Sequence, residues 1–228
     1  MKLEKKYLAE LAGTGIIVLF MISATMGDGS PFMKQPIALG FGLGAFFISY
    51  CLFYKSSGGH FNPVVTASYW MAGKMEQDEA KTIIIHQVIG AAAGLVLAYI
   101  FQLGYSDFEN MDIPEGRLGV NEGYLGVVLI IGFSTGILSM VYMAIDNNKN
   151  EWIHLFRSVI LTLFVGGIMA VGMAANAFGG TNPAILAIDF LTSLTNDFGD
   201  AIVGLLVCVV GCGLGAYSAG KAWSKIYG

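Results

Sequence analysis

Six long apolar stretches, separated by short polar or glycine-rich segments, set the pattern of this 228-residue chain. They cover about residues 7–26, 35–54, 80–103, 123–145, 153–178 and 201–222. A helix needs roughly 20 mostly apolar residues to cross a bilayer, whereas the strands of a membrane barrel need only about 9–11. The pattern therefore predicts an all-α membrane protein with six transmembrane helices.

Two shorter segments interrupt this pattern, "SSGGHFNPVVTASYWMAGK" after the second stretch and "GGTNPAILAIDFLTSLTND" after the fifth. Each is moderately apolar, too short to cross, and has Asn-Pro near its start. Proline suits the first turn of a helix and asparagine is a favoured cap. We therefore expect two half-helices that enter the membrane and begin at Asn62 and Asn182.

The order of elements repeats, because residues 1–112 and residues 113–228 each hold two spans, a half-helix and a third span. Three spans are an odd number, so the second half must enter from the opposite face. The two half-helices then point at one another near the midplane, as in inverted-repeat transporters. The two repeats together are expected to form one domain.

Composition and charge agree with a membrane location. The chain is 55% hydrophobic and 12% charged, against about a quarter charged in soluble domains. Ten of the twelve Lys and Arg residues fall on the side that holds both termini, which predicts that this side is cytoplasmic. The first stretch is long and lacks a convincing small-residue cleavage site, so we expect a retained helix and not a signal peptide.

Glycines at four-residue spacing recur in the predicted helices. Such small faces allow close helix packing within a bilayer. The pairs are Gly40 and Gly44, Gly90 and Gly94, Gly132 and Gly136, and Gly211 and Gly215.

Four motifs make the chain similar to the aquaporin and glycerol-facilitator family, the major intrinsic proteins: "AELAGTGIIVLF", "SGGHFNPVVT", "HQVIGAAAG" and "TNPA". The resemblance covers essentially the whole chain. It implies a passive plasma-membrane channel for small uncharged solutes such as glycerol-like molecules, water, urea or ammonia. It also implies a homotetramer with no catalytic step, cofactor, metal or nucleic-acid partner.

By this resemblance the pore centre lies where the two half-helices meet. Two helix N-termini each present roughly half a positive charge, so they would repel cations while the asparagine amides donate to a passing oxygen. The expected residues of the pore centre are Asn62, Pro63, Val64, Asn182, Pro183 and Ala184.

Three further residues are expected to support the pore or its loops. The glutamate of the family that matches Glu10 holds backbone amides of the re-entrant loop, which favours a structural role over proton coupling. His60 either lines the pathway or braces the loop, and both roles stay open. Gln87, like its neighbour His86, is expected to brace the loop and pack between helices.

The sequence departs from the family where the second motif usually continues with arginine, because that position is Ile185. Counting from Asp146 places Ile130 where the second repeat usually has a glutamate. Residues expected at the selectivity filter are Phe41 or Gly42 in the second span, Ala170, Gly179 and Ile185. Such a filter would be small, apolar and wide.

One other class of membrane protein remains open, an inverted-repeat secondary transporter for a small solute. Coupling would require titratable groups at the site, and the few at membrane depth do not pair with one another. An enzyme is not expected, since no set of nucleophile, base and orienting group is visible.

Overall fold

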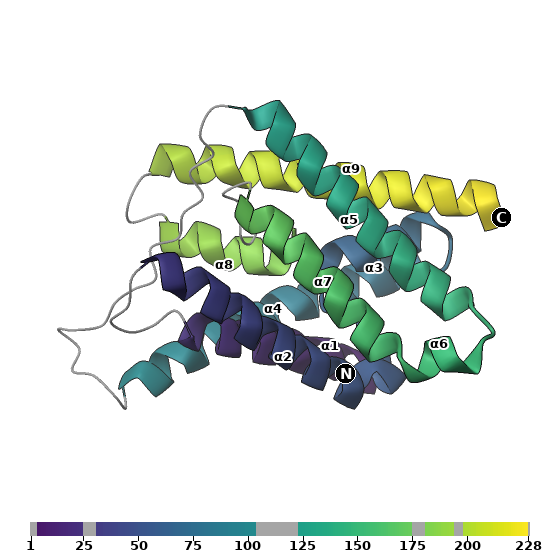
Figure 1. Cartoon of the computed structure of the whole chain (residues 1–228), viewed down its shortest axis with the longest axis horizontal. Coiled ribbons are helices and arrows are strands. Elements are labelled where there is room, and N and C mark those ends of the chain that lie inside the picture. Colours follow the sequence, from purple (N-terminus) through teal and green to yellow (C-terminus); the bar gives the residue numbers. More distant parts are fainter. Residues whose placement is uncertain (1–3, 25–30, 104–122, 175–180, 194–197, 228) are drawn as a thin grey trace.

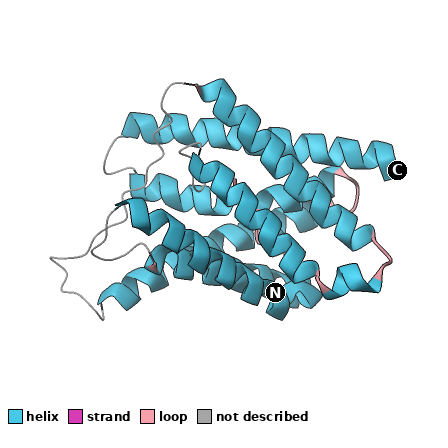
Figure 2. Ribbon diagram, in the orientation of Figure 1, coloured by secondary structure: helices cyan, strands magenta, loops and turns pink. Residues whose placement is uncertain are grey.

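A computed structural model of the chain describes residues 4–24, 31–103, 123–174, 181–193 and 198–227, and every element in these ranges is an α-helix (Figure 1, Figure 2). This confirms the all-α prediction. The helices are α1 (Lys5–Ser23), α2 (Pro31–Ser57), α3 (Pro63–Met71), α4 (Gln77–Leu103), α5 (Tyr124–Asn147), α6 (Glu151–Leu155), α7 (Arg157–Ala174), α8 (Pro183–Ser193) and α9 (Phe198–Tyr227).

The spans largely follow the apolar stretches. Within the described residues, α1, α2, α4, α5 and α9 are long and apolar enough to cross a membrane, and α7 is apolar but shorter. The fifth stretch differs from the prediction, because its first residues form the separate helix α6, which is capped by the side chain of Asn150. The end of that stretch, residues 175–178, lies outside the described residues.

The two halves of the chain pack in a similar way. α1 runs along α4, and α5 runs along α9. The short helices α3 and α8 lie between them, α3 mainly against α9 and α8 against both α4 and α9. Figure 1 shows α8 toward one end of the bundle and α3 toward the other. The predicted boundary at residue 113 lies outside the described residues.

Glycine makes the closest helix contacts possible. A Cβ atom placed on Gly94 of α4 would lie 2.3 Å from the carbonyl oxygen of Gly15 in α1. A Cβ atom on Gly215 of α9 would lie 2.7 Å from the carbonyl oxygen of Gly132 in α5. Because real Cβ atoms do not approach backbone this closely, any larger residue would push these helices apart.

The remaining glycine pair behaves differently from the prediction. Gly40 and Gly44 lie on the outer face of α2, where an added Cβ atom would meet nothing within 4 Å. Their expected role in packing within the chain is therefore wrong.

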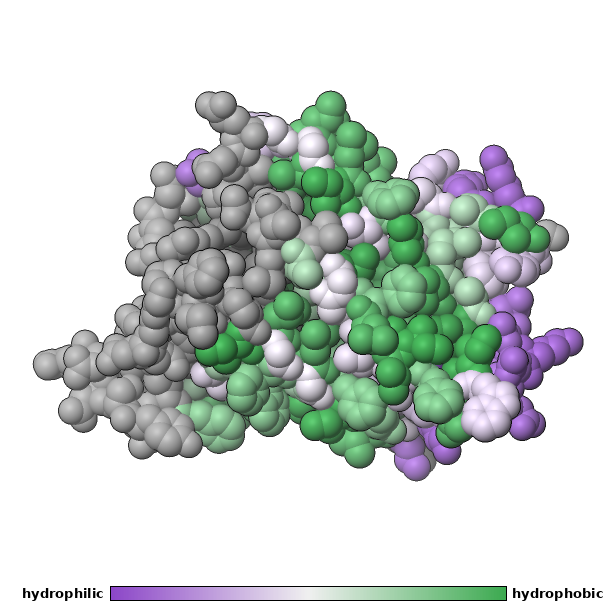
Figure 3. Space-filling view, viewed as in Figure 1, coloured by the Kyte–Doolittle hydropathy of each residue, from purple (hydrophilic) through white to green (hydrophobic). Residues whose placement is uncertain are grey.

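Both termini lie at the same end of the bundle, together with α6 and the turn between α3 and α4 (Figure 1). The ammonium group of Lys74 in that turn lies 4.7 Å from the ring centre of Trp223 near the end of α9. Figure 3 shows hydrophilic residues gathered at this end and a hydrophobic band over the middle of the helices. Such a band fits the hydrocarbon core of a bilayer.

Candidate functional site

Each half-helix begins as the Asn-Pro pattern predicts. The side-chain oxygen of Asn62 accepts a hydrogen bond from the backbone N–H of Val64 at 2.9 Å, and α3 starts at Pro63. The oxygen of Asn182 likewise accepts from the N–H of Ala184 at 3.1 Å. These bonds cap the two helices and leave both amide nitrogens for other partners.

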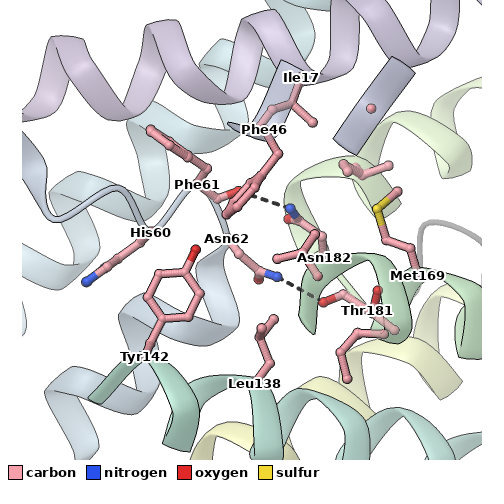
Figure 4. A pocket seen from close by; sticks show the side chains of 14 residues that line it. Ile17, Phe46, His60, Phe61, Asn62, Leu138, Tyr142, Met169, Thr181 and Asn182 are labelled. Carbon is pink, nitrogen blue, oxygen red and sulfur yellow. Dashed lines mark hydrogen bonds between the residues drawn. The ribbon is translucent and has the colours of Figure 1, made fainter. Parts of the chain in front are cut away.

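The two asparagines, 120 residues apart in the sequence, meet at the centre of the bundle (Figure 4). The Nδ2 group of Asn62 donates to the carbonyl oxygen of Thr181 at 3.1 Å. The Nδ2 group of Asn182 donates to the carbonyl oxygen of Phe61 at 3.0 Å. Each asparagine thus binds the residue that precedes the other one. Because an amide nitrogen carries two N–H bonds, a second donor of each side chain is available to the space beside them.

A cavity opens at this meeting point. The space that the centre of a water molecule can occupy in it is about 30 Å³, which is room for about two water molecules. Its polar wall includes His60, Asn62, Thr181 and Asn182. Its apolar lining comes from α1, α2, α5, α7 and α8 and includes Ile17, Gly42, Phe46, Leu138, Ile168, Met169 and Ile185. The lining therefore combines polar groups near the starts of the two half-helices with apolar side chains from the surrounding helices.

The electrostatic character of the cavity follows from the half-helices. The N-termini of α3 and α8 both point at it, and each carries roughly half a positive charge. Two such ends disfavour a cation at the centre, while the amide N–H groups favour an oxygen atom that can accept hydrogen bonds.

Glu10 of α1 is fully buried and holds the loop that leads into α3. Its two carboxyl oxygens accept the backbone N–H of His60 at 2.9 Å and the N–H of Phe61 at 2.7 Å. Phe61 has a φ angle of 46°, in the left-handed region that side chains rarely adopt. The loop thus keeps a strained conformation that turns the Phe61 carbonyl toward Asn182.

A second set of bonds braces the same loop. The side-chain amide of Gln87 donates to Glu10 at 2.8 Å and to the hydroxyl of Thr66 at 3.0 Å. The Nδ1 atom of His60 lies 3.1 Å from that same hydroxyl. His60 also lines the cavity, so it belongs both to the braced loop and to the cavity wall.

Of the two candidates in the second span, the structure places only one at the cavity. Gly42 is buried and lines the cavity, whereas Phe41 is 54% exposed on the outside of the bundle. One residue corresponds to about 100° of rotation on a helix, which carries Phe41 away from the cavity. The expectation that Phe41 faces the filter is therefore wrong.

The fifth-span candidate is also displaced by one residue. Ala170 is exposed on the outside of α7, and its neighbour Met169 lines the cavity. Ile185 is buried and lines the cavity as expected, and Gly179 lies outside the described residues. A long thioether side chain thus replaces the small one that we expected opposite Ile185.

The other expected pore-centre residues lie behind the two asparagines and do not line the cavity. Pro63 and Val64 are buried in the first turn of α3, and Pro183 and Ala184 form the first turn of α8. Val64 packs against residues of α5, α8 and α9.

The expected counterpart of Glu10 in the second repeat is also displaced. Ile130 is 42% exposed, whereas its neighbour Ile131 is fully buried. Ile130 therefore does not face inward as Glu10 does in the first half.

Several residues of the cavity were not predicted. Phe61 and Thr181 directly precede the two asparagines, and the repeat symmetry could have indicated them. No sequence signal marks Phe46, Leu138 or Tyr142, which reach the cavity only through the packing of α2 and α5.

Three comparisons with known proteins agree with this architecture. The sequence model of the family described as "Major intrinsic protein" matches residues 1–218. The chain is 31% identical over 195 residues to glycerol uptake facilitator protein-like 6 of Lactiplantibacillus plantarum, covering 80% of this chain and 84% of that one. It is 26% identical over 216 residues to the glycerol uptake facilitator protein of Buchnera aphidicola, covering 84% of this chain and 80% of that one.

The fold is also that of a solved structure. The X-ray structure of the aquaglyceroporin from Plasmodium falciparum matches 97% of this chain and 96% of its own length, with a TM-score of 0.72 and 20% sequence identity.

Proposed function

Because the chain belongs to the major intrinsic protein family, we propose that it is a passive membrane channel for small uncharged solutes, with glycerol as the first candidate. Relatives that are named glycerol uptake facilitators support this choice of solute. The proposed activity has no chemical step and needs no cofactor or metal.

The single observation that carries the proposal is the meeting of Asn62 and Asn182. Each amide is fixed by two hydrogen bonds, one to its own helix and one to the opposite loop. Because these donors are already held in place, little free energy is spent on ordering them when a solute binds. We propose that the remaining N–H groups donate to the oxygen of a solute as it crosses the centre.

The composition of the cavity wall supports a solute that carries both polar and apolar groups. A polyol such as glycerol presents hydroxyl groups along one edge and a carbon backbone along the other. The hydroxyl groups would face His60 and the asparagines, and the carbons would face Ile17, Leu138 or Ile185. A buried hydroxyl without a partner costs about 1–3 kcal/mol, so a pathway with a polar side lowers the barrier for such a molecule.

The hydrogen bonds of the Glu10 carboxylate support passive transport over coupled transport. Both of its carboxyl oxygens are occupied by the loop and by Gln87. A group that shuttles protons must exchange partners, whereas this one holds three donors in place.

The proposed setting is the plasma membrane, with both termini in the cytoplasm. This orientation rests on the excess of Lys and Arg on the side of the termini. We also propose a homotetramer. Gly40 and Gly44, which form an open small-residue face on α2, would let a helix of a second copy approach closely.

The proposal is tested with purified protein in vesicles, by following the light-scattering change after a jump in glycerol concentration. We expect glycerol entry above that of empty vesicles, and loss of that entry in Asn182→Leu, which removes both the cap and the donor. Asn148→Leu, in the turn before α6, provides the matched control. Glycerol entry that is equal in the parent and in Asn182→Leu would refute the channel assignment.

A further inference from the structure

Aromatic rings close the end of the cavity that faces the termini. His60 and Tyr142 line this end, and their ring centres lie 6.2 Å apart with the ring planes 87° to one another. Figure 4 shows them side by side, on the side of the cavity away from Met169. Both residues are buried, with only 1% of Tyr142 and 3% of His60 exposed. The pathway is therefore pinched at these two residues.

The ring of Tyr142 is fixed in place. Its hydroxyl donates to the carbonyl oxygen of Gly59 at 3.2 Å. Gly59 has a φ angle of 68°, and a Cβ atom there would lie 2.8 Å from the ring of Tyr50. Tyr142, the loop backbone and Tyr50 are thus packed without spare room, so the ring cannot move aside on its own.

An ion pair behind these rings links four elements. Asp146 of α5 accepts hydrogen bonds from the hydroxyl of Tyr69 in α3 and from the guanidinium group of Arg157 in α7. The Nε group of Arg157 also donates to the hydroxyl of Tyr50 in α2 at 2.8 Å. The ring of Tyr69 lies 4.5 Å from that of His60, centre to centre. The network therefore surrounds His60 and Tyr142 from α2, α3, α5 and α7.

The opposite end of the described cavity contrasts with this arrangement. Gly42 has no side chain, and Met169 is flexible because it has three rotatable torsions. Ile185 offers neither a ring nor a charge. An aperture of fixed width needs stiff walls, and a tyrosine with a bonded hydroxyl supplies one with only two torsions.

We propose that His60 and Tyr142 form the section of this pathway that selects solutes by width, and that Asp146 and Arg157 are positioning residues for it. The inference rests on the proposed channel function and locates its selectivity at the end near the termini, away from Ile185. The apparent filter can then be apolar while the protein still discriminates between polyols.

The test measures the rate of entry of a five-carbon polyol relative to that of glycerol, in vesicles that contain the full chain. Tyr142→Leu should raise this ratio at least about threefold, which corresponds to about 0.7 kcal/mol of barrier. Tyr142→Phe keeps the ring and loses only the hydroxyl bond that helps to fix it, so it should raise the ratio by less than Tyr142→Leu does. Tyr124→Leu, the same substitution on an exposed part of α5, is the control. If Tyr142→Leu does not fold, Tyr142→Met takes its place with the same expected increase.

The positioning role has its own measurement. Arg157→Met removes the bonds to Tyr50 and Asp146 and should raise the polyol ratio less than Tyr142→Leu does. Arg157→Lys keeps the charge next to Asp146 and should restore part of the discrimination. An unchanged ratio in Tyr142→Leu, with glycerol entry intact in the parent, would overturn the inference and leave the channel function standing. Absence of glycerol entry in the parent would instead refute the channel function itself.

Discussion

Replacing Glu10 by glutamine tests how the loop before α3 is held. The substitution keeps the shape of the side chain but turns one of its two acceptor oxygens into a donor. Three N–H groups point at this carboxylate, from His60, Phe61 and Gln87, at distances of 2.7–2.9 Å. The amide oxygen of glutamine can take the place of Oε2 and keep the hydrogen bonds from Phe61 and Gln87. The N–H of His60 then faces another donor.

The magnitude follows from these bonds. A buried donor left unpaired costs about 1–3 kcal/mol, and each of the two remaining bonds loses about 1 kcal/mol when its acceptor becomes neutral. We therefore expect Glu10→Gln to lower the free energy of unfolding by about 3–5 kcal/mol. The loop would also be less able to hold Phe61 at its φ angle of 46°, so glycerol entry should fall together with stability.

Reversible unfolding of the purified protein in mixed detergent micelles provides the assay, with vesicle flux measured on the same variants. Glu76→Gln, at an exposed position between α3 and α4, is the matched control and should stay within about 0.5 kcal/mol of the parent. A loss of less than 1 kcal/mol in Glu10→Gln would contradict the bonding scheme. If stability were unchanged, and if a proton gradient drove glycerol uptake by the parent but not by Glu10→Gln, Glu10 would instead have a coupling role.

Three other predictions follow from the packing and from the cavity. Gly94→Ala should destabilise the protein by about 1–3 kcal/mol, since the new Cβ atom would lie 2.3 Å from a backbone oxygen. Gly44→Ala, where the added Cβ atom meets nothing, is the control, and equal unfolding curves for the two variants would disprove the close contact. Ile185→Arg should reduce glycerol flux more than water flux, because the longer side chain fills the cavity beside Gly42 and Met169; a gain of glycerol flux would show that Ile185 does not narrow the pathway. Tags placed at residues 1 and 228 should both be protected from an impermeant reagent outside intact cells, and opposite responses would overturn the six-span topology.

The sequence predicted the parts of the fold that depend on local patterns. Apolar length located the spans, and Asn-Pro located the first residues of α3 and α8, because capping and the fixed φ angle of proline act within one helical turn. It did not predict α6, because its apolar residues Ile153 and Leu155 form the start of the fifth apolar stretch. The cap residue Asn150 was the available signal.

Positions that depend on helix rotation were predicted less well. Counting along the chain from Asn182 gave Ala170 where Met169 faces the cavity, because a count that starts on another helix does not fix how α7 is rotated about its own axis. The pairing of Arg157 with Asp146 and Tyr50 was also not predicted. Arg157 and Tyr50 are 107 residues apart, and only the assembled bundle brings them together.

The reciprocal bonds between the two loops also bear on how the chain is made. While the ribosome is still adding the 119 residues between Asn62 and Asn182, the amide of Asn62 has no Thr181 carbonyl to bind. At about 5–20 residues per second, this interval lasts roughly 6–24 s. The first half inserted into a membrane therefore cannot complete a conducting centre by itself. The central pair of bonds thus forms only after the second half has been made and has packed against the first.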